Sequence, residues 1–282
     1  MKVSLIQMNS ISDKAANIAA ARALIERAVA EEAPDWVLLP EHFDWAGGVK
    51  ADKLLNAEAL PGGPAYRTAQ ELAAKHGIFV HAGSFMERIE GEDRIHNTSV
   101  VFNRKGEEIA RYRKIHLFDV TTPDGASYKE SATVKAGDLI VTYDCEGVTV
   151  GCAICYDLRF PGLFQALADK GAEVIALPAA FTKETGKDHW EVLLRARAIE
   201  TETYVCASAQ TGTFTVNNES RATYGHSLVA DPWGLVVAKA SDGVGIVSTR
   251  LDMAQVKRVR RMIPVAQHRL NSPLSAKFGA RA

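Results

Sequence analysis

The chain has 282 residues, of which 47% are hydrophobic and 24% charged, and its formal net charge is −1. This composition is typical of a folded globular protein and favours neither nucleic acid nor an anionic membrane as a partner. There is no apolar run of about 18 residues and no signal-peptide pattern, so we expect a cytoplasmic protein without a membrane span. Four cysteines in a chain of this length do not make a disulfide framework, and we expect free thiols.

The first half of the chain alternates short apolar runs with segments of helical spacing. These patterns predict strand, helix, strand, helix and strand, in that order, at residues 3–8, 13–31, 35–40, 65–76 and 78–84. Two further strands, at 96–103 and 107–113, flank Asn103-Arg104-Lys105-Gly106, which predicts a hairpin. A long polar loop is expected to follow, as far as Glu130.

The second half repeats this order, with elements predicted at residues 149–155, 162–170, 172–178, 188–201, 203–210, 226–231 and 235–240. A shift of 128 positions places Asn103 on Asp231 and Gly106 on Gly234. Two such halves most simply form α/β architecture in which two sheets face each other and helices cover both outer faces. Because no Ser- and Gly-rich linker separates the halves, we expect one domain over 1–282, with residues 270–282 as a C-terminal tail.

Cys155 follows the apolar run 148–154 and precedes a helical segment that begins at Pro161. This order predicts a strand, a tight turn and a helix, with the thiol at the turn beside free backbone N–H groups. Most buried cysteines are inert packing residues, but this position makes Cys155 a candidate nucleophile. Cys152 forms a C-x-x-C with Cys155, but no second pair of ligands accompanies it, so we predict no metal site.

A thiol nucleophile needs a base, and the sequence offers two kinds. His116, His189 and His226 are candidates of the usual kind. Glu41 is the competing base, because it follows the apolar strand at 35–40, where desolvation should raise its pKa. Taken alone, an exposed charge at a strand end is the commoner explanation of Glu41.

Lys114 follows the predicted hairpin and carries the charge needed to stabilise an oxyanion, with the backbone N–H of Tyr156 as a second donor. Glu130 is a further carboxylate, at the end of the polar loop. Taken alone, Lys114 and Glu130 are also typical of solvated surface charges.

Three motifs together resemble the signatures of the nitrilase superfamily, the carbon–nitrogen hydrolases. They are Leu-Leu-Pro-Glu at 38–41, Tyr-Arg-Lys-Ile-His-Leu at 112–117 and Gly-Cys-Ala-Ile-Cys-Tyr-Asp-Leu-Arg-Phe-Pro at 151–161. The resemblance covers nearly the whole chain. It implies a single carbon–nitrogen hydrolase domain, a four-layer α-β-β-α sandwich with internal pseudo-two-fold symmetry, and a homodimer that packs through outer helices.

The resemblance also implies a Glu–Lys–Cys triad at Glu41, Lys114 and Cys155, with Glu130 as a second glutamate. In the implied mechanism Glu41 takes the thiol proton while Lys114 and the Tyr156 N–H hold the oxyanion. A thioester forms as ammonia leaves, and water then hydrolyses it. No metal and no organic cofactor are implied.

Within the superfamily, the C-terminal half is most similar to the Nit amidase branch, at residues 189–201, 224–227 and 231–234. That branch hydrolyses small amides that carry a carboxylate or an α-keto acid. It includes the deaminated glutathione amidases, which the run at 193–201 resembles more, and the ω-amidases, which act on α-ketoglutaramate-type substrates. Besides an ω-amidase, the alternatives are a true nitrilase and an inactive binding or scaffold protein.

A carboxylate on such a substrate needs a cationic anchor. We predict Arg159 for this role, because it lies four residues after Cys155 and offers a bidentate guanidinium. The alternative for Arg159 is a structural ion pair with a neighbouring acid such as Asp157.

The strand at 172–178 mirrors the strand that precedes Glu41, so the residues after it should border the same site. Thr185 is expected to bond the substrate there. Aromatic side chains are expected as steric walls, namely Phe43, Phe181 and Trp190.

Overall fold

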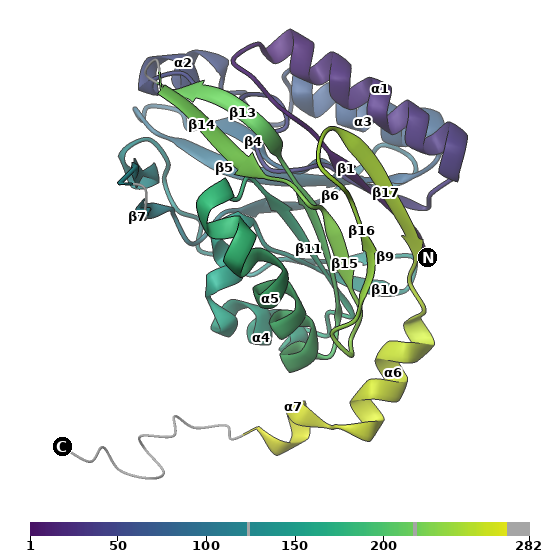
Figure 1. Cartoon of the computed structure of the whole chain (residues 1–282). Coiled ribbons are helices and arrows are strands. Elements are labelled where there is room, and N and C mark those ends of the chain that lie inside the picture. The colour runs from purple at the N-terminus through teal and green to yellow at the C-terminus, as the bar shows by residue number, and fades with distance from the viewer. Residues whose placement is uncertain (123–124, 217–218, 270–282) are drawn as a thin grey trace, which may run out of the picture.

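The structure is a computed structural model, and it describes residues 1–122, 125–216 and 219–269. Two β-sheets form its centre (Figure 1). The first has the order β17-β1-β2-β3-β5-β4, with β6 beside β5: β1 (Lys2–Gln7), β2 (Trp36–Leu38), β3 (Phe79–His81), β4 (Phe85–Arg88), β5 (Ile95–Phe102), β6 (Glu108–Arg113) and β17 (Gly245–Arg250). The second has the order β16-β15-β12-β11-β10-β9: β9 (Thr142–Cys145), β10 (Val148–Cys152), β11 (Val174–Ala179), β12 (Tyr204–Ala209), β15 (Leu228–Ala230) and β16 (Val236–Lys239).

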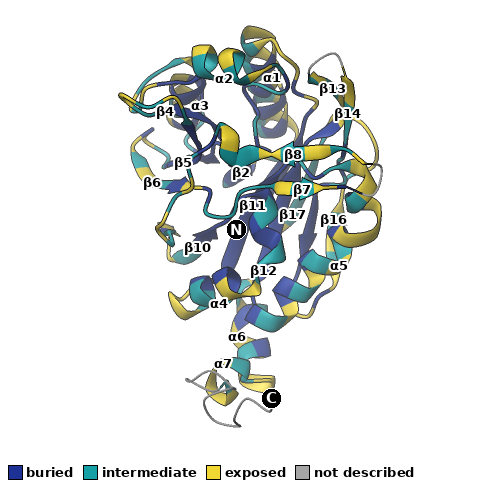
Figure 2. Cartoon of the chain, turned by 90° about the vertical axis from the view of Figure 1, so that its left-hand side faces the viewer, coloured by how far each residue is buried: buried dark blue, intermediate teal, exposed yellow. Residues whose placement is uncertain are grey.

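Side-chain alternation along the strands gives each sheet two apolar faces. In β1, Leu5 belongs to the apolar cluster that the two sheets share, whereas Ile6 belongs to the cluster beneath the helices of the first sheet. Trp36 and Val37 of β2 divide in the same way. The central strands are therefore buried on both faces, as the dark centre of Figure 2 shows.

Helices cover the outer face of each sheet (Figure 1). α1 (Lys14–Glu32) and α3 (Pro64–His76) pack on the first sheet, and α4 (Pro161–Asp169) and α5 (Lys183–Thr201) pack on the second. The order is helix, sheet, sheet, helix, so the predicted α/β fold class is confirmed.

The predicted repeat is visible in detail at the two hairpins β5–β6 and β15–β16. The Oδ1 atoms of Asn103 and Asp231 each accept two backbone N–H groups of their own turn. Gly106 and Gly234 follow with φ of 75° and 83°, a left-handed conformation that glycine adopts without steric cost. Register shifts fall at positions 101–102 in one hairpin and 229–230 in the other, again separated by 128 residues.

Several elements lie outside the predicted ranges. Most of them are partly exposed and polar, without a regular apolar period, and β4 is the buried exception. The long loop before Glu130 contains the hairpin β7 (Asp119–Thr121) and β8 (Ser127–Lys129), and Glu130 begins the turn η1 (Glu130–Ala132). α5 begins at Lys183, five residues before the predicted start, since its first turn is polar. The other unpredicted elements are α2 (Lys50–Asn56), β4, β9, the hairpin β13 (Thr211–Val216) and β14 (Glu219–Tyr224), and β17.

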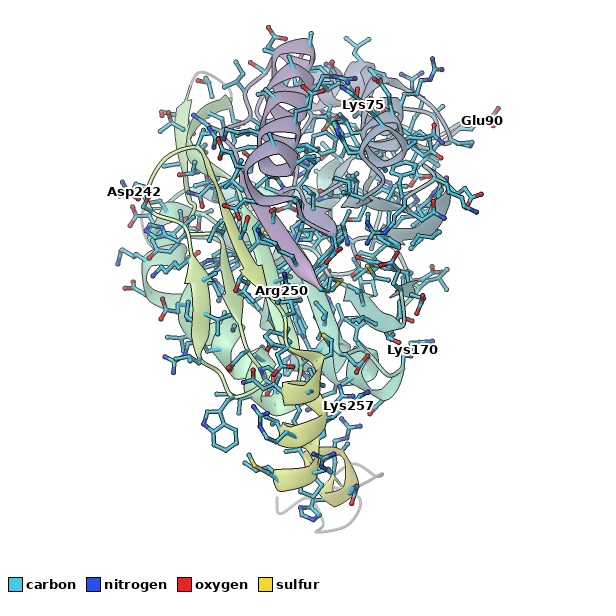
Figure 3. The ribbon with its side chains drawn as sticks, turned by 90° about the vertical axis from the view of Figure 1, so that its right-hand side faces the viewer. Lys75, Glu90, Lys170, Asp242, Arg250 and Lys257 are labelled. Carbon is cyan, nitrogen blue, oxygen red and sulfur yellow. The ribbon has the colours of Figure 1, made fainter. Side chains whose placement is uncertain are left out.

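After β17, the helices α6 (Met253–Met262) and α7 (Val265–His268) extend away from the layers (Figures 1 and 3). Lys257 lies on α6, as Figure 3 shows. The predicted tail at 270–282 lies outside the described residues. Over 1–122, 125–216 and 219–269, none of the helices has the length and apolarity to cross a bilayer.

Candidate active site

Cys155 stands at the turn between β10 and α4, where the short 3₁₀ helix η2 (Cys155–Arg159) begins. Its φ is +46°, a left-handed conformation that non-glycine residues adopt at a cost of about 1–3 kcal/mol. Pro161 begins α4, and the predicted strand–turn–helix order is confirmed. The residue is 7% exposed, so its thiol reaches solvent only through the cavity described below.

Asp157 holds this turn in place. Its carboxylate accepts hydrogen bonds from the backbone N–H of Ile154 at 2.8 Å and from the Tyr112 hydroxyl at 2.7 Å. The Nδ1 atom of His116 lies 2.7 Å from the same carboxylate, and the His116 backbone N–H donates to it at 3.1 Å. The cysteine turn is thereby tied to the two ends of the segment that carries Lys114.

Glu41 lies beyond the end of β2 and is 2% exposed. Its Oε1 accepts from Lys114 Nζ at 3.0 Å and from Asn97 Nδ2 at 2.9 Å. Its Oε2 accepts from the backbone N–H of Ala180, just after β11, at 2.8 Å. The Cys155 thiol lies close enough to the Glu41 carboxylate for each group to shift the pKa of the other. The carboxylate is therefore oriented by both sheets.

Lys114, at the end of β6, bridges Glu41 and Glu130. Its Nζ lies 3.2 Å from one oxygen of Glu130 and 3.0 Å from the other. Glu130 also accepts the Phe118 backbone N–H at 2.7 Å, which fixes the second carboxylate. The structure thus brings together all four predicted residues of the centre: Glu41, Lys114, Glu130 and Cys155.

The charges of these groups depend on one another. Burial alone would raise the pKa of Glu41, but the Lys114 ammonium, His42 and the neighbouring Cys155 thiol bring it down to about 2. The expectation of a raised Glu41 pKa is wrong, because it counted desolvation without the neighbouring cation.

Burial and the Glu41 charge raise the pKa of Cys155 well above its usual value. Burial opposes the charge of Lys114, but Glu130 and Glu41 keep its pKa well above the ordinary value. Near neutral pH the centre therefore holds a thiol, a carboxylate and an ammonium.

Three possible ligand atoms, from Glu41, His42 and Glu130, lie within 4.8 Å of one another. Lys114 Nζ lies 3.0 Å from both carboxylates. A metal ion there would have to displace this ammonium or withstand its repulsion at close range, so the donor set does not suit a cation.

A cavity of about 400 Å³ contains the centre, and Glu41, Lys114, Glu130, Cys155 and Tyr156 all line it. Its walls come from the loop 42–49, α2, β8, the segment 180–185 and the hairpin β13–β14. Much of the wall therefore consists of the exposed elements that the sequence analysis did not predict.

Two of the predicted substrate contacts, Phe181 and Thr185, line this cavity. Phe43 does not: it is 1% exposed and packs edge-on against Phe85 in the core, because the left-handed φ of +54° at His42 turns the chain inward. Trp190 is fully buried and likewise does not line the cavity.

Arg159, the predicted carboxylate anchor, is also absent from the cavity wall. Its guanidinium carbon lies 5.2 Å from the centroid of the Phe181 ring, and Nη2 lies 3.3 Å from His189 Nδ1. The predicted alternative, an ion pair with Asp157, is not formed either. In this structure Arg159 supports Phe181 from outside the cavity.

The three histidines considered as alternative bases do not line the cavity. His116 is bonded to Asp157 and stacked on Phe160, and His226 Nδ1 lies 2.8 Å from the Tyr224 carbonyl. The sequence analysis overlooked His42, which does line the cavity, and Asn97, which orients Glu41. Asn97 gives no sequence signal except a polar side chain in a buried strand opposite the Lys114 segment.

Comparison with known proteins agrees with this geometry. The carbon–nitrogen hydrolase family model matches residues 2–261. A deaminated glutathione amidase of Synechocystis sp. (strain PCC 6803 / GT-S) is 41% identical over 268 residues, which are 94% of this chain and 96% of the relative. The deaminated glutathione amidase of Homo sapiens is 41% identical over 273 residues, 95% of this chain and 81% of the relative.

Among solved structures, Saccharomyces cerevisiae Nit3, a member of branch 10 of the nitrilase superfamily, matches with a TM-score of 0.85 and 33% identity. The match covers 96% of this chain and 97% of Nit3. The family predicted from the three motifs is confirmed: the chain belongs to the carbon–nitrogen hydrolase family.

Proposed function

We propose that the protein is a cysteine-dependent amidase in which Cys155 is the nucleophile, Glu41 the general base and Lys114 the oxyanion donor. The observation that carries the proposal is their convergence: a thiol, a carboxylate and an ammonium line one cavity, and the ammonium donates a hydrogen bond to the carboxylate. Glu130 holds Lys114 in place and keeps it charged.

In the first step the Cys155 proton moves to Glu41 as sulfur bonds to the amide carbon, and the carbonyl electron pair becomes an oxyanion. Lys114 and the Tyr156 backbone N–H stabilise that oxyanion, and one such donor lowers the activation free energy by about 3–4 kcal/mol. The negative charge of the oxyanion offsets the positive charge of Lys114. Lys114 then lowers the pKa of Glu41 less than before, so Glu41 binds the arriving proton more strongly. Glu41 then protonates the leaving nitrogen, the C–N bond breaks, and a thioester remains.

In the second step Glu41 takes a proton from water as the water oxygen attacks the thioester carbon. The C–S bond breaks, the proton returns to sulfur, and the acid leaves. The bonds from Asn97 and Ala180 keep the Glu41 carboxylate oriented through both steps.

For the substrate we propose a carboxylate-bearing amide of the deaminated glutathione type, as the names of the relatives indicate. This choice changes one expectation. A primary amide such as α-ketoglutaramate releases ammonia, but deaminated glutathione retains the glutathione skeleton and would release an amine, cysteinylglycine. An assay that counts only ammonia would miss this reaction.

The test is a panel of deaminated glutathione, α-ketoglutaramate, succinamate and a simple nitrile, with ammonia and new primary amine both measured. We expect the highest kcat/KM for deaminated glutathione, with release of amine. A preference for α-ketoglutaramate would support an ω-amidase, and a preference for the nitrile would support a nitrilase. Failure on all four, together with no labelling of Cys155 by any of them, would indicate a binding or scaffold protein.

We also propose a homodimer that packs through α5. Exposed apolar side chains gather on this helix and on the neighbouring turn between β15 and β16, namely Val192 (65% exposed), Ile199 (50%), Trp233 (54%) and Leu235 (61%). Arg195 of α5 donates to the carbonyl of Gly234, so helix and turn form one surface. Val192→Asp should convert a dimer to a monomer in light scattering.

The four buried free thiols support the expected cytoplasmic location.

A further inference from the structure

The cavity wall carries more positive than negative charge. Of the residues that the structure describes, five cationic side chains line it, Lys50, Lys53, Lys114, Lys129 and Arg221, and two carboxylates do, Glu41 and Glu130. Lys114 is bonded to both of those carboxylates, so none of the other four cations has a further acid among the described residues of the cavity wall. For a chain with a net charge of −1, this is a local concentration of positive charge that attracts anions.

Two of these cations are neutralised from outside the cavity. Lys50 Nζ lies 2.7 Å from Asp93, and Arg221 Nη2 lies 2.6 Å from Glu219. The Arg221 guanidinium also lies 5.1 Å from the centroid of the Tyr128 ring. A third cation, Lys129, is exposed.

Lys53 differs from them. It lies on α2, one turn after Lys50, and its ammonium has no ion pair or hydrogen bond within residues 1–122, 125–216 and 219–269. Burial lowers its pKa, and the nearby Lys114 adds to that effect, while Glu130 opposes it. Lys53 is half-buried, so its ammonium loses part of its hydration without gaining a partner, and an anionic ligand would supply that partner.

α2 is held firmly enough to present this side chain. The Val49 backbone N–H donates to Asp52 at the start of the helix, and Lys14 Nζ donates to the Asn56 carbonyl at its end, at 2.6 Å. The preceding residue Gly48 donates to the carbonyl of Thr215 in β13, at 3.2 Å. Lys53 is therefore placed relative to the centre by contacts on both sides of the cavity.

We propose that Lys53 binds a carboxylate of the substrate, and that it makes the cavity selective for amides with a carboxylate away from the scissile bond. This rests on the proposed amidase function and names the residue that recognises the acid group. It replaces Arg159, whose guanidinium packs on Phe181 and His189 outside the cavity wall.

The first test measures binding without turnover. Glutarate, a simple dicarboxylate, is titrated into the wild type and into Lys53→Met by calorimetry. We expect a roughly 10- to 100-fold weaker Kd in the variant, the range for loss of a charged hydrogen bond. Lys53→Arg should recover most of the affinity, and Lys50→Met, on the same helix but paired with Asp93, should change Kd by less than about threefold. Equal binding to the wild type and Lys53→Met would overturn the proposal, whatever the enzymatic activity.

The second test uses turnover. Deaminated glutathione is compared with two analogues, each with one carboxylate replaced by a hydroxymethyl group, in the wild type and in Lys53→Met. We expect the KM of the intact substrate to rise in the variant, and the rise to disappear for the one analogue that lacks the bound carboxylate. An equal rise for all three compounds would show that Lys53 acts only on cavity shape and would contradict the proposal. If the wild type cleaves none of them, the proposed function fails, and the glutarate titration still decides the role of Lys53.

Discussion

The two halves of the molecule share one frame but present different groups at the ends of their strands. β2 and β11 occupy corresponding places in their sheets. The chain after β2 presents the side chain of Glu41, whereas the chain after β11 presents the backbone N–H of Ala180, which bonds to that same carboxylate. The first half supplies the ionised groups of the centre, and the second supplies the thiol. The two halves therefore share the arrangement of strands and helices, whereas a few residues at the strand ends differ between them and supply the reactive groups.

The largest effect should follow from removing the ionised strand end of the first half. Glu41→Gln keeps the shape and the contact with Ala180 but cannot accept the thiol proton. We expect kcat to fall by roughly 10²- to 10⁴-fold, the range for loss of a general base. The matched change in the second half is Glu184→Gln, at an exposed position after β11, and it should leave kcat within about threefold of the wild type. A kcat of Glu41→Gln close to that of the wild type would contradict the assignment of the base.

Asp157 joins the halves, so its loss should separate the thiol from Lys114. Asp157→Asn retains the volume but loses a charge that accepts bonds from Ile154 and Tyr112. We expect kcat to fall by roughly 10- to 100-fold with KM nearly unchanged, since charged hydrogen bonds of about 1.5–3 kcal/mol are weakened. Steady-state kinetics measure this split. A change confined to KM would mean that Asp157 affects substrate binding rather than the position of Cys155.

The halves should also differ in how their stability responds to pH. Burial raises the pKa of Asp44, in the loop after Glu41, to about 7, although Lys14 Nζ lies 3.0 Å from it. In the unfolded chain an aspartate titrates near a pKa of about 3.9. The folded state therefore holds the extra proton between these values, and the free energy of unfolding should fall as pH rises from about 4 to about 7.

Asp44→Asn should remove this part of the pH dependence, whatever it does to the absolute stability. Urea unfolding at several pH values between 4 and 7 measures the slope. If the slope is the same in the variant and the wild type, Asp44 is not the titrating group.

The smallest effect should distinguish the two repeated turns. Asn103 and Asp231 cap their turns alike, but Asp231 Oδ2 also accepts from Gln255 of α6 at 2.6 Å. We expect Asn103→Ala to lower the free energy of unfolding by about 1 kcal/mol and Asp231→Ala by about 2 kcal/mol. Urea denaturation at one pH compares them. Equal losses would show that the contact with α6 adds nothing.

Much of the scaffold is predictable from sequence because the buried elements carry strong periodic patterns. β1, β2, β10, β11 and the helices that cover them follow the predicted order, and the repeat across Asn103 and Asp231 extends to the register shifts. The exposed elements around the cavity are not predictable in this way, since α2 and the hairpins β7–β8 and β13–β14 have no buried face of regular period.

The same distinction applies to the site. Glu41, Lys114, Glu130 and Cys155 end or follow buried elements, and the structure places them together. The substrate contacts depend on side-chain packing that local sequence does not encode. Arg159 turns to Phe181 and His189, and Phe43 turns into the core. The pKa of Glu41 likewise depends on how close Lys114 lies, which spacing along the chain does not reveal.

In the proposed mechanism Cys155 carries the acyl group between the two steps. Rapid acid quenching during turnover of deaminated glutathione, followed by intact-mass and peptide-mass spectrometry, measures this directly. We expect an added acyl mass on the peptide that contains Cys155, removed by hydroxylamine and absent in Cys155→Ala. An active enzyme whose acyl adduct lies on another residue, or a Cys155→Ala variant that retains activity, would contradict it.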